Sequence, residues 1–236
     1  MSRPRKESGR TVTAEEIKAV ARRQMSEHGT AGLSLRAIAR ELGITAPALY
    51  NYFPRLEDLI TTLIVDAFTA LAVAMETAGA EARTEGAGLW ETFTRITRAY
   101  RAWAVAHPTD FQLIYGNPIP GYHAPTDLTG PLAQRPFAQL FDLLQAGWRS
   151  GQISLPEEYQ PVPPALAGHI RAYRTKSGLD LPEVLICVLL SGWARIHGQV
   201  MLELFHHSQP FIGDPGLFYE LELSAYLRRL GLPPPG

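Results

Sequence analysis

Residues 46–52 form a short segment that can make hydrogen bonds but shows no arrangement suited to catalysis. Tyrosine hydroxyls and an asparagine amide stand among alanines and a proline. Small side chains allow a helix to enter the major groove of DNA, which is roughly 12 Å wide, and hydroxyl and amide groups bind phosphates or base edges. Arg36, a little earlier in the chain, can fork onto a guanine. The segment therefore predicts contact with duplex DNA through Ala46, Pro47, Ala48, Tyr50, Asn51 and Tyr52.

Two short helices joined by a glycine turn would position these side chains. Ser34 is expected to cap the first helix, and Gly43 stands where a helix end needs a left-handed residue. Thr45 is expected to cap the second helix, which starts at the next residue. Leu49 and Phe53, four residues apart, share the face that packs on the first helix. This order is the pattern of a helix-turn-helix.

The charge balance differs between the two ends of the chain. Residues 1–56 carry ten Lys or Arg and five acids, a balance of +5, whereas residues 57–236 carry twelve and eighteen, a balance of −6. The total of −1 therefore conceals a basic end and an acidic body. Such asymmetry fits one end meeting phosphate, although segments of this length often deviate by a few charges.

A further helix is expected ahead of the helix-turn-helix. Thr13-Ala-Glu-Glu16 is a capping box that precedes apolar residues at helical spacing, and the helix should end near Gly29. Three helices then form one small domain over residues 13–54. Residues 1–12 have no apolar period and are rich in Lys and Arg, so they are predicted to be a disordered basic arm. Such an arm can follow a minor groove or remain a solvated tail.

Residues 13–59 resemble the amino-terminal DNA-binding domain of the TetR family of bacterial transcriptional repressors. The matching residues are Leu35-Arg-Ala-Ile-Ala-Arg-Glu-Leu-Gly-Ile-Thr-Ala-Pro-Ala-Leu-Tyr-Asn-Tyr-Phe53, followed by Glu57-Asp-Leu59. The resemblance implies that Arg36, Ala46, Pro47, Ala48 and Asn51 approach bases, and that Thr45, Tyr50 and Tyr52 hold phosphates. Family members usually carry a lysine just before the acidic pair, where this chain has Leu56. Arg55 stands one residue earlier as a substitute for that phosphate contact.

The rest of the chain, residues 55–236, is predicted to be one helical body, so the fold class is all-α. No stretch resembles a strand ladder, and a hydrophobic share of 46% supplies a sizeable core. Residues 116–131 and 150–164 are rich in proline and should be loops. Helices are expected at residues 56–78, 89–107, 108–115, 132–148, 165–177, 181–207 and 215–230.

Two of these helices predict a homodimer. Residues 181–207 begin almost apolar on every side, and residues 215–230 are amphipathic. A soluble chain must cover such faces, and two helices from each subunit can form a four-helix interface. The uninterrupted apolar run is about seven residues, well below the roughly 20 needed to cross a membrane. A monomer that buries both helices internally is the alternative. A two-fold dimer would read a palindromic operator.

The body also contains aromatic and histidine residues that could line a ligand cavity. Most of them have the spacing of core residues, but helix bundles hold small molecules between facing helices. Trp193-Ala-Arg-Ile-His-Gly198 and the loop of residues 115–122 resemble a subgroup of TetR-like regulators with a Trp-x-x-x-His-Gly carboxy-terminal domain. The candidate ligand-binding residues are Trp103, His107, Tyr115, Trp148, Trp193 and His197.

Catalysis, metals and cofactors find no support in the sequence. The one cysteine, Cys187, is embedded in an apolar run and indicates a small buried residue in a reducing cytoplasm. Adjacent His206 and His207 point to different faces of a helix, and no pattern of Cys, Asp or Glu accompanies them. Nucleotide-binding glycine loops, a nucleophile elbow and a signal peptide are likewise not found.

These observations predict a cytoplasmic, homodimeric regulator of transcription, most simply a repressor that leaves its operator when an unidentified small molecule binds the body. The alternative is a ligand-binding or interaction module without sequence-specific DNA recognition, which Leu56 at the usual lysine position keeps open.

Overall fold

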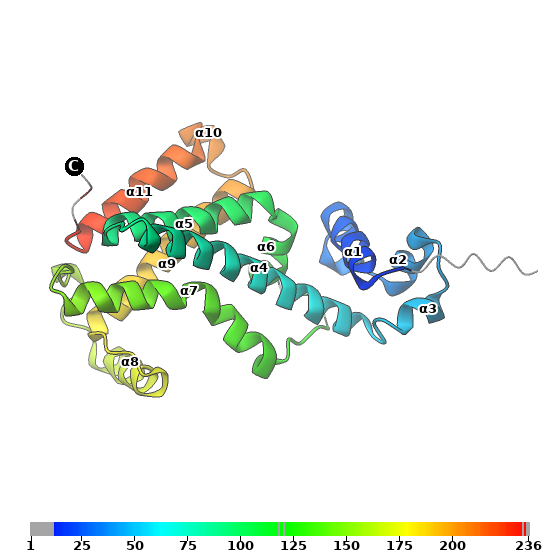
Figure 1. Ribbon diagram of the computed structural model, residues 1–236, viewed down its shortest axis with the longest axis horizontal. Coiled ribbons are helices and arrows are strands. Elements are labelled where there is room, and N and C mark those ends of the chain that lie inside the picture. Colours follow the sequence, from blue (N-terminus) through cyan, green and yellow to red (C-terminus); the bar gives the residue numbers. More distant parts are fainter. Residues whose placement is uncertain (1–11, 118, 120, 233, 235–236) are drawn as a thin grey trace, which may run out of the picture. The chain divides into compact units, whose positions relative to one another are not determined.

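The structure of the protein, a computed structural model, describes residues 12–117, 119, 121–232 and 234. Every regular element within these residues is a helix, so the all-α fold class is confirmed (Figure 1). Packing divides the chain into two compact units. The first comprises the residues up to Thr69 together with His107–Ala133, and the second comprises Ala70–Ala106 together with the residues from Gln134 onward. This division follows contacts alone, and the domain boundary between residues 54 and 55 stays a prediction.

The first helix of the first unit, α1 (Ala14–His28), begins at the expected capping box. The Glu16 amide donates to Thr13 Oγ1 at 3.2 Å, and the Thr13 amide donates to Glu16 Oε2 at 2.9 Å. The helix ends before Gly29, whose φ of 72° suits glycine. Residues 1–11 of the expected arm lie outside the described residues. Val12, which we also expected in the arm, is buried against the unit's core because apolar side chains surround it.

The helix-turn-helix consists of α2 (Leu35–Leu42) and α3 (Ala46–Tyr50). Gly43 ends α2 in the left-handed region, and Thr45 caps α3 by accepting from the Ala48 amide, both as expected. Ser34 occupies the N-cap position of α2, as expected, but its side chain accepts no capping hydrogen bond from the described residues. A short 3₁₀ turn, η1 (Thr30–Gly32), connects α1 to α2.

The second helix of this motif is shorter than its apolar spacing suggested. After α3 the chain turns, because the Tyr52 and Phe53 amides both donate to the Leu49 carbonyl and Pro54 cannot continue a helix. Phe53 nevertheless remains buried beside Leu49, as the four-residue spacing predicted. The turn leaves Asn51 and Tyr52 at the end of α3, on the surface.

Helices α4 (Leu56–Thr84) and α6 (Pro108–Tyr115) complete the packing around α1. Lys18 of α1 donates to Asp66 of α4 at 2.7 Å, and Arg22 of α1 donates to Asp110 of α6 at 2.9 Å. The core of this unit includes side chains from α1 to α4 and the end of α6: Ile17, Ile38, Leu49, Leu59, Leu63 and Leu113.

The second unit is built from the rest of α4, the later part of α7 and the remaining helices. These are α5 (Leu89–Ala106), α7 (Thr126–Arg149), η2 (Glu157–Tyr159), α8 (Pro164–Ser177), α9 (Glu183–Leu204), α10 (Gln209–Ile212) and α11 (Pro215–Arg229). Figure 1 shows α11 lying beside α5, where the Tyr219 hydroxyl donates to the Thr97 carbonyl at 2.6 Å. Helices α9 and α11 approach closely, since a Cβ atom at Gly192 would lie 2.5 Å from the Tyr226 ring.

Helices α4 and α7 are longer than we expected, α4 at its end and α7 at its start. Helix α4 continues through Gly79, where Gln139 and Ile96 occupy the space of a side chain. Helix α7 starts at Thr126 rather than residue 132, because the Leu128 and Thr129 amides already donate to the Pro125 carbonyl. The loop expected over residues 116–131 is therefore confined to its first part.

Helices α4 and α9 are long and apolar enough to qualify as membrane spans on length and composition, which the short apolar runs did not predict. Their most apolar windows are 50% and 44% buried within the described fold, as in core helices of soluble proteins. We therefore interpret both as packing helices.

Candidate DNA-binding surface and ligand cavity

The exposed side of α3 is made of small side chains. Leu49 faces inward and is fully buried, which fixes the orientation of this five-residue helix. Ala46 and Ala48 are half-buried, whereas Thr45 and Pro47 are exposed. Since none of these side chains is long, the backbone of α3 can come close to base edges in a groove.

The polar residues at the end of α3 differ in how they are engaged. Tyr50 is 38% exposed and Asn51 is exposed, so both can reach a ligand. Tyr52 is 43% exposed, but its hydroxyl donates to the Val12 carbonyl at 2.5 Å. A phosphate contact through the Tyr52 hydroxyl therefore requires that this bond be shared or released.

The arginines of this unit fall into two groups. Arg22, Arg23 and Arg55 form ion pairs with Asp110, Glu41 and Asp58. Arg36 and Arg40 are exposed, lie four residues apart on α2, and have no hydrogen-bond or ion-pair partner among the residues that the structure describes. The unpaired arginines of the described helix-turn-helix therefore lie along one face of α2.

Arg55 is fully engaged at the start of α4. Its Nη2 lies 2.7 Å from Asp58 Oδ1, its Nε donates to Oδ2 at 3.2 Å, and its backbone amide donates to Oδ2 at 3.0 Å. This guanidinium holds the pKa of the Asp58 carboxyl below its ordinary value. Asp58 thus competes with a phosphate for Arg55.

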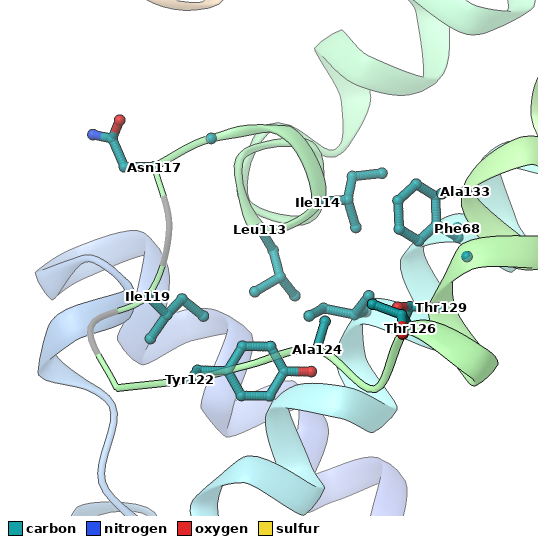
Figure 2. Close-up of a pocket in the computed structure, with 13 residues that line it drawn as sticks. Phe68, Leu113, Ile114, Asn117, Ile119, Tyr122, Ala124, Thr126, Thr129 and Ala133 are labelled. Atoms are coloured by element: carbon teal, nitrogen blue, oxygen red, sulfur yellow. The ribbon is translucent and has the colours of Figure 1, made fainter. Parts of the chain in front are cut away.

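A cavity of about 380 Å³ lies within the first unit, between α4, α6, the loop that follows α6 and the start of α7 (Figure 2). Its lining residues are Ile64, Phe68, Leu113, Ile114, Gly116, Asn117, Ile119, Tyr122, Ala124, Thr126, Thr129, Gly130 and Ala133. In Figure 2, Leu113 points from α6 toward Tyr122, and the Asn117 amide points away from the other side chains.

The hydroxyl groups around this cavity are only partly satisfied within the protein. Tyr122 and Thr61 share a hydrogen bond of 2.9 Å in which either can donate. The Thr129 hydroxyl donates to the Pro125 carbonyl at 3.0 Å. Thr126 is exposed, and its hydroxyl makes no hydrogen bond to any described residue.

An aromatic cluster occupies the second unit, where α5, α7 and α9 meet. The Tyr100 hydroxyl lies 2.8 Å from His197 Nδ1, and the Trp193 ring centroid lies 4.6 Å from that of His197. The Phe137 ring stands edge-on to Trp193 at 4.3 Å. Burial of the imidazole lowers the pKa of His197.

The structure brings together only some of the residues predicted to bind a ligand. Trp193 and His197 share the aromatic cluster, whereas Tyr115 packs edge-on against Phe68 at 5.8 Å in the first unit. Trp103 is buried in α5, His107 is exposed before α6, and Trp148 is half-buried on α7. None of the six lines the cavity in Figure 2. Their role in ligand binding stays a prediction.

Two protein-family models match parts of this chain. Residues 17–62 match the family model described as bacterial regulatory proteins, tetR family, and residues 93–226 match that of the tetracyclin repressor-like C-terminal domain. The chain belongs to the TetR family. The resemblance of the helix-turn-helix segment to this family is thereby confirmed.

Curated relatives and solved structures agree with this membership. The chain is 38% identical over 205 residues to the HTH-type transcriptional regulator Rv1816 of Mycobacterium tuberculosis and, equally, to Mb1846 of Mycobacterium bovis, with 85% of each chain covered. The solved structure of a regulatory protein, SCO4313, has a TM-score of 0.73 and 34% identity over 91% of this chain and 94% of that one. A Rhodococcus protein of unknown function shares the fold at a TM-score of 0.70 and 20% identity, covering 96% and 100% of the two chains.

TetR-family membership makes the protein a DNA-binding transcriptional regulator with a carboxy-terminal ligand-binding and dimerisation domain. The family is not a class of enzymes. Since the curated relatives are regulators, the alternative of a module without DNA recognition loses its support.

Sequence reasoning missed two features of this TetR-family chain. No role was predicted for Arg40, although its spacing of four from Arg36 places both on one helix face. The helical residues of the cavity gave no signal, since threonine, isoleucine and alanine are ordinary on any helix. Of the cavity wall, the sequence indicated only the loop of residues 115–122, through its resemblance to a TetR-like subgroup. Only the folded chain brings them around one space.

Proposed function

We propose that the protein is a cytoplasmic, homodimeric repressor that binds a palindromic operator and is released by a small molecule. The observation that carries the DNA-binding role is the small-residue face of α3 flanked by the unpaired arginines of α2. The repressor role and the release by ligand rest on TetR-family membership, since these modes are typical of the family.

Base contacts are assigned to α3 and to the start of α2. Ala46, Pro47 and Ala48 allow close approach, and the Asn51 amide can pair with an adenine. Arg36 can fork onto a guanine. Thr45, Tyr50 and Tyr52 are assigned to phosphates, with Tyr52 sharing its bond to Val12.

The phosphate contact expected from Arg55 is assigned in part to Arg40. Arg55 is held by Asp58 through three hydrogen bonds, whereas Arg40 is exposed and unpaired within the described residues. The first helix of a helix-turn-helix crosses the DNA backbone, so Arg40 on α2 is well placed for a phosphate. Both arginines are included among the DNA contacts, with Arg40 as the stronger one.

The dimer interface is assigned to α9 and α11. Leu190, Ala194, Gly198 and Leu202 recur every four residues along α9, and both leucines are exposed. Leu217 and Leu221 are 71% and 58% exposed on the neighbouring α11. An apolar surface of this kind, spread over two packed helices, fits a two-fold four-helix interface. Leu221→Glu should convert the dimer to a monomer in sedimentation, while Leu166→Glu on α8 should not.

Release of the operator is assigned to the contacts that hold α1. Lys18 and Arg22 bind acids on α4 and α6, so a displacement of either helix changes the position of α1. A ligand drives this change only if it binds the two conformations with unequal affinity. A preference of about 100-fold supplies roughly 2.7 kcal/mol.

The experiment that tests DNA recognition is a gel-shift titration against the DNA upstream of the gene at two salt concentrations. Specific binding should persist at a salt concentration that removes binding to a random duplex of equal length. Equal affinity for both duplexes at every salt concentration would contradict the proposal.

Arg40→Gln and Arg55→Gln form a matched pair for the phosphate assignment. Each replaces an exposed arginine of the same unit with the same neutral side chain. Arg40→Gln should reduce the slope of log affinity against log salt by about one, the effect of one lost phosphate contact, and Arg55→Gln should reduce it by less. A larger loss for Arg55→Gln would reverse the assignment.

A further inference from the structure

The wall of the cavity in the first unit is uncharged wherever the structure describes it. The thirteen described residues that line it include no Asp, Glu, Lys, Arg or His. A charged molecule would lose its hydration there without gaining an ionic partner, which is unfavourable. The chemistry of the wall therefore selects against ions.

The apolar part of the wall comes from three helices. Ile64 and Phe68 of α4 and Leu113 and Ile114 of α6 are buried or half-buried, and Ala133 adds the surface of α7. The volume, about 380 Å³, is within the range of roughly 300–1,000 Å³ that is usual for small-molecule sites and lies toward its lower end. A compact apolar molecule fits this space.

Hydroxyl groups lie on one side of the cavity. Thr126 can donate or accept, because its hydroxyl makes no hydrogen bond within the described residues. Thr129 has already donated to Pro125, so it can only accept from a ligand. In Figure 2 the two threonines lie next to each other, opposite Leu113 and Ile119. This arrangement suits one hydroxyl or carbonyl group on an otherwise apolar molecule.

We propose that this cavity is the effector site and that it takes an uncharged, compact and mainly apolar molecule with one hydroxyl or carbonyl group near Thr126 and Thr129. The proposal rests on the proposed function, which requires an effector, and names its chemical class and its location. Two of the candidate ligand-binding residues from the sequence, Trp193 and His197, lie in the aromatic cluster of the second unit, whereas the proposal places the effector in the cavity of the first unit.

The position of the cavity explains how a bound molecule can influence the DNA-binding helices. Phe68 lies two residues after Asp66, and Leu113 lies one turn after Asp110. These two acids hold Lys18 and Arg22 of α1. A molecule seated between α4 and α6 therefore acts on the helices that carry both attachments of α1.

Three matched pairs of compounds test the chemical class on the full chain at pH 7. The uncharged members are 2-naphthol, 1-decanol and 4-phenylphenol, and their charged counterparts are 2-naphthoate, decanoate and biphenyl-4-carboxylate. At least one uncharged member should bind in calorimetry and raise the melting temperature, at an affinity at least about tenfold above that of its carboxylate. Binding of none of the three, or equal binding of the carboxylates, would overturn the proposal.

Two variants test the location. Ala133→Leu places a larger side chain in the wall of the cavity, and Ala138→Leu makes the same change on the exposed side of α7. Ala133→Leu should weaken binding of the compound by about tenfold or more, because the larger side chain takes up space that the compound needs. Ala138→Leu should leave the affinity unchanged. If Ala133→Leu fails to fold, Ala124→Leu at the exposed rim of the cavity serves in its place. Unchanged affinity in the variant that folds would place the ligand elsewhere.

The same proteins separate this inference from the proposed function. Operator binding by the unliganded chain tests the DNA-binding role and does not depend on any compound. Compound binding that Ala133→Leu abolishes supports the site whether or not DNA is released. Loss of operator binding on addition of the compound would support the ligand-released repressor as well.

Discussion

The helix-turn-helix and the aromatic cluster contain similar residue types but use them in opposite ways. Tyr50 and Tyr52 stand on the surface, 38% and 43% exposed, at the end of a helix fixed by one buried leucine. Tyr100 is buried, and its hydroxyl is bound to His197 beside Trp193. A tyrosine thus marks a ligand-facing surface only where the local pattern already shows which side of its helix is buried.

The largest expected effect comes from removing that buried leucine. Leu49→Ala should lower the free energy of unfolding by about 2–5 kcal/mol, since this α3 side chain is fully buried in the core of the first unit. Thermal melting measures the loss, and operator binding should fall with it. A melting temperature equal to that of the wild-type protein would show that α3 is not held in the way described.

Arg36→Ala should have the next largest effect, and only on DNA binding. Loss of a bidentate contact to guanine should cost about 1–3 kcal/mol in operator affinity and relax specificity at one position of each half-site. Fluorescence anisotropy with single-base operator variants measures both. The control is Arg83→Ala, which removes an exposed arginine near the end of α4. An equal loss of operator affinity in both variants would show that Arg36 contributes only through its charge and not through a base contact.

Asp110→Asn should have a smaller effect, on both stability and operator binding. The Asp110 carboxylate accepts two hydrogen bonds from Arg22, at 2.9 and 3.1 Å, and is largely buried. Its neutralisation should cost about 1–3 kcal/mol of stability and change operator affinity in the absence of ligand. Asp142→Asn, at an exposed position of α7, is the control. Wild-type melting and wild-type operator affinity in Asp110→Asn would remove this ion pair from the proposed release mechanism.

The smallest effect concerns pH and the aromatic cluster. Burial lowers the pKa of His197 below its ordinary value of 6.5, so the unfolded chain binds the proton more readily than the folded chain. Protonation of His197 therefore does not reduce the free energy of unfolding above pH 6.5. The free energy of unfolding falls as the pH decreases from 6.5 through the lower folded-state pKa. The slope should not exceed about 1.4 kcal/mol per pH unit.

Denaturant titrations of the wild-type protein and of His197→Gln at several pH values measure this slope. It should be reduced in His197→Gln and retained in His169→Gln, which changes an exposed histidine of the same unit. A slope that persists unchanged in His197→Gln would assign the pH dependence to other groups.

The degree to which the sequence predicted the structure follows from the range of the interactions involved. Capping at Thr13 and Thr45, the left-handed Gly43 and the burial of Leu49 all depend on neighbours within four residues, and each was predicted. The early start of α7 depends on the Pro125 carbonyl and was not predicted, because glycine and proline near the first turns of a helix usually indicate a loop.

The candidate site shows the same contrast. The surface of α3 could be read from spacing, whereas the engagement of Arg55 by Asp58 and of Tyr52 by Val12 required the folded chain. The cavity is formed by residues from α4, α6 and α7 that lie up to about seventy positions apart in the sequence. Tertiary packing alone brings them together, so no local pattern could indicate them.

The two attachments of α1 have a practical consequence for sensor design. Asp66 of α4 pairs with Lys18 at 2.7 Å and also with Arg22 at 3.7 Å, whereas Asp110 of α6 binds Arg22. The attachment to α6 can therefore be weakened while Lys18 stays bound to α4. Graded substitutions at Asp110 should therefore yield a series of reporters with stepwise set points, in which the attachment of Lys18 to α4 is retained.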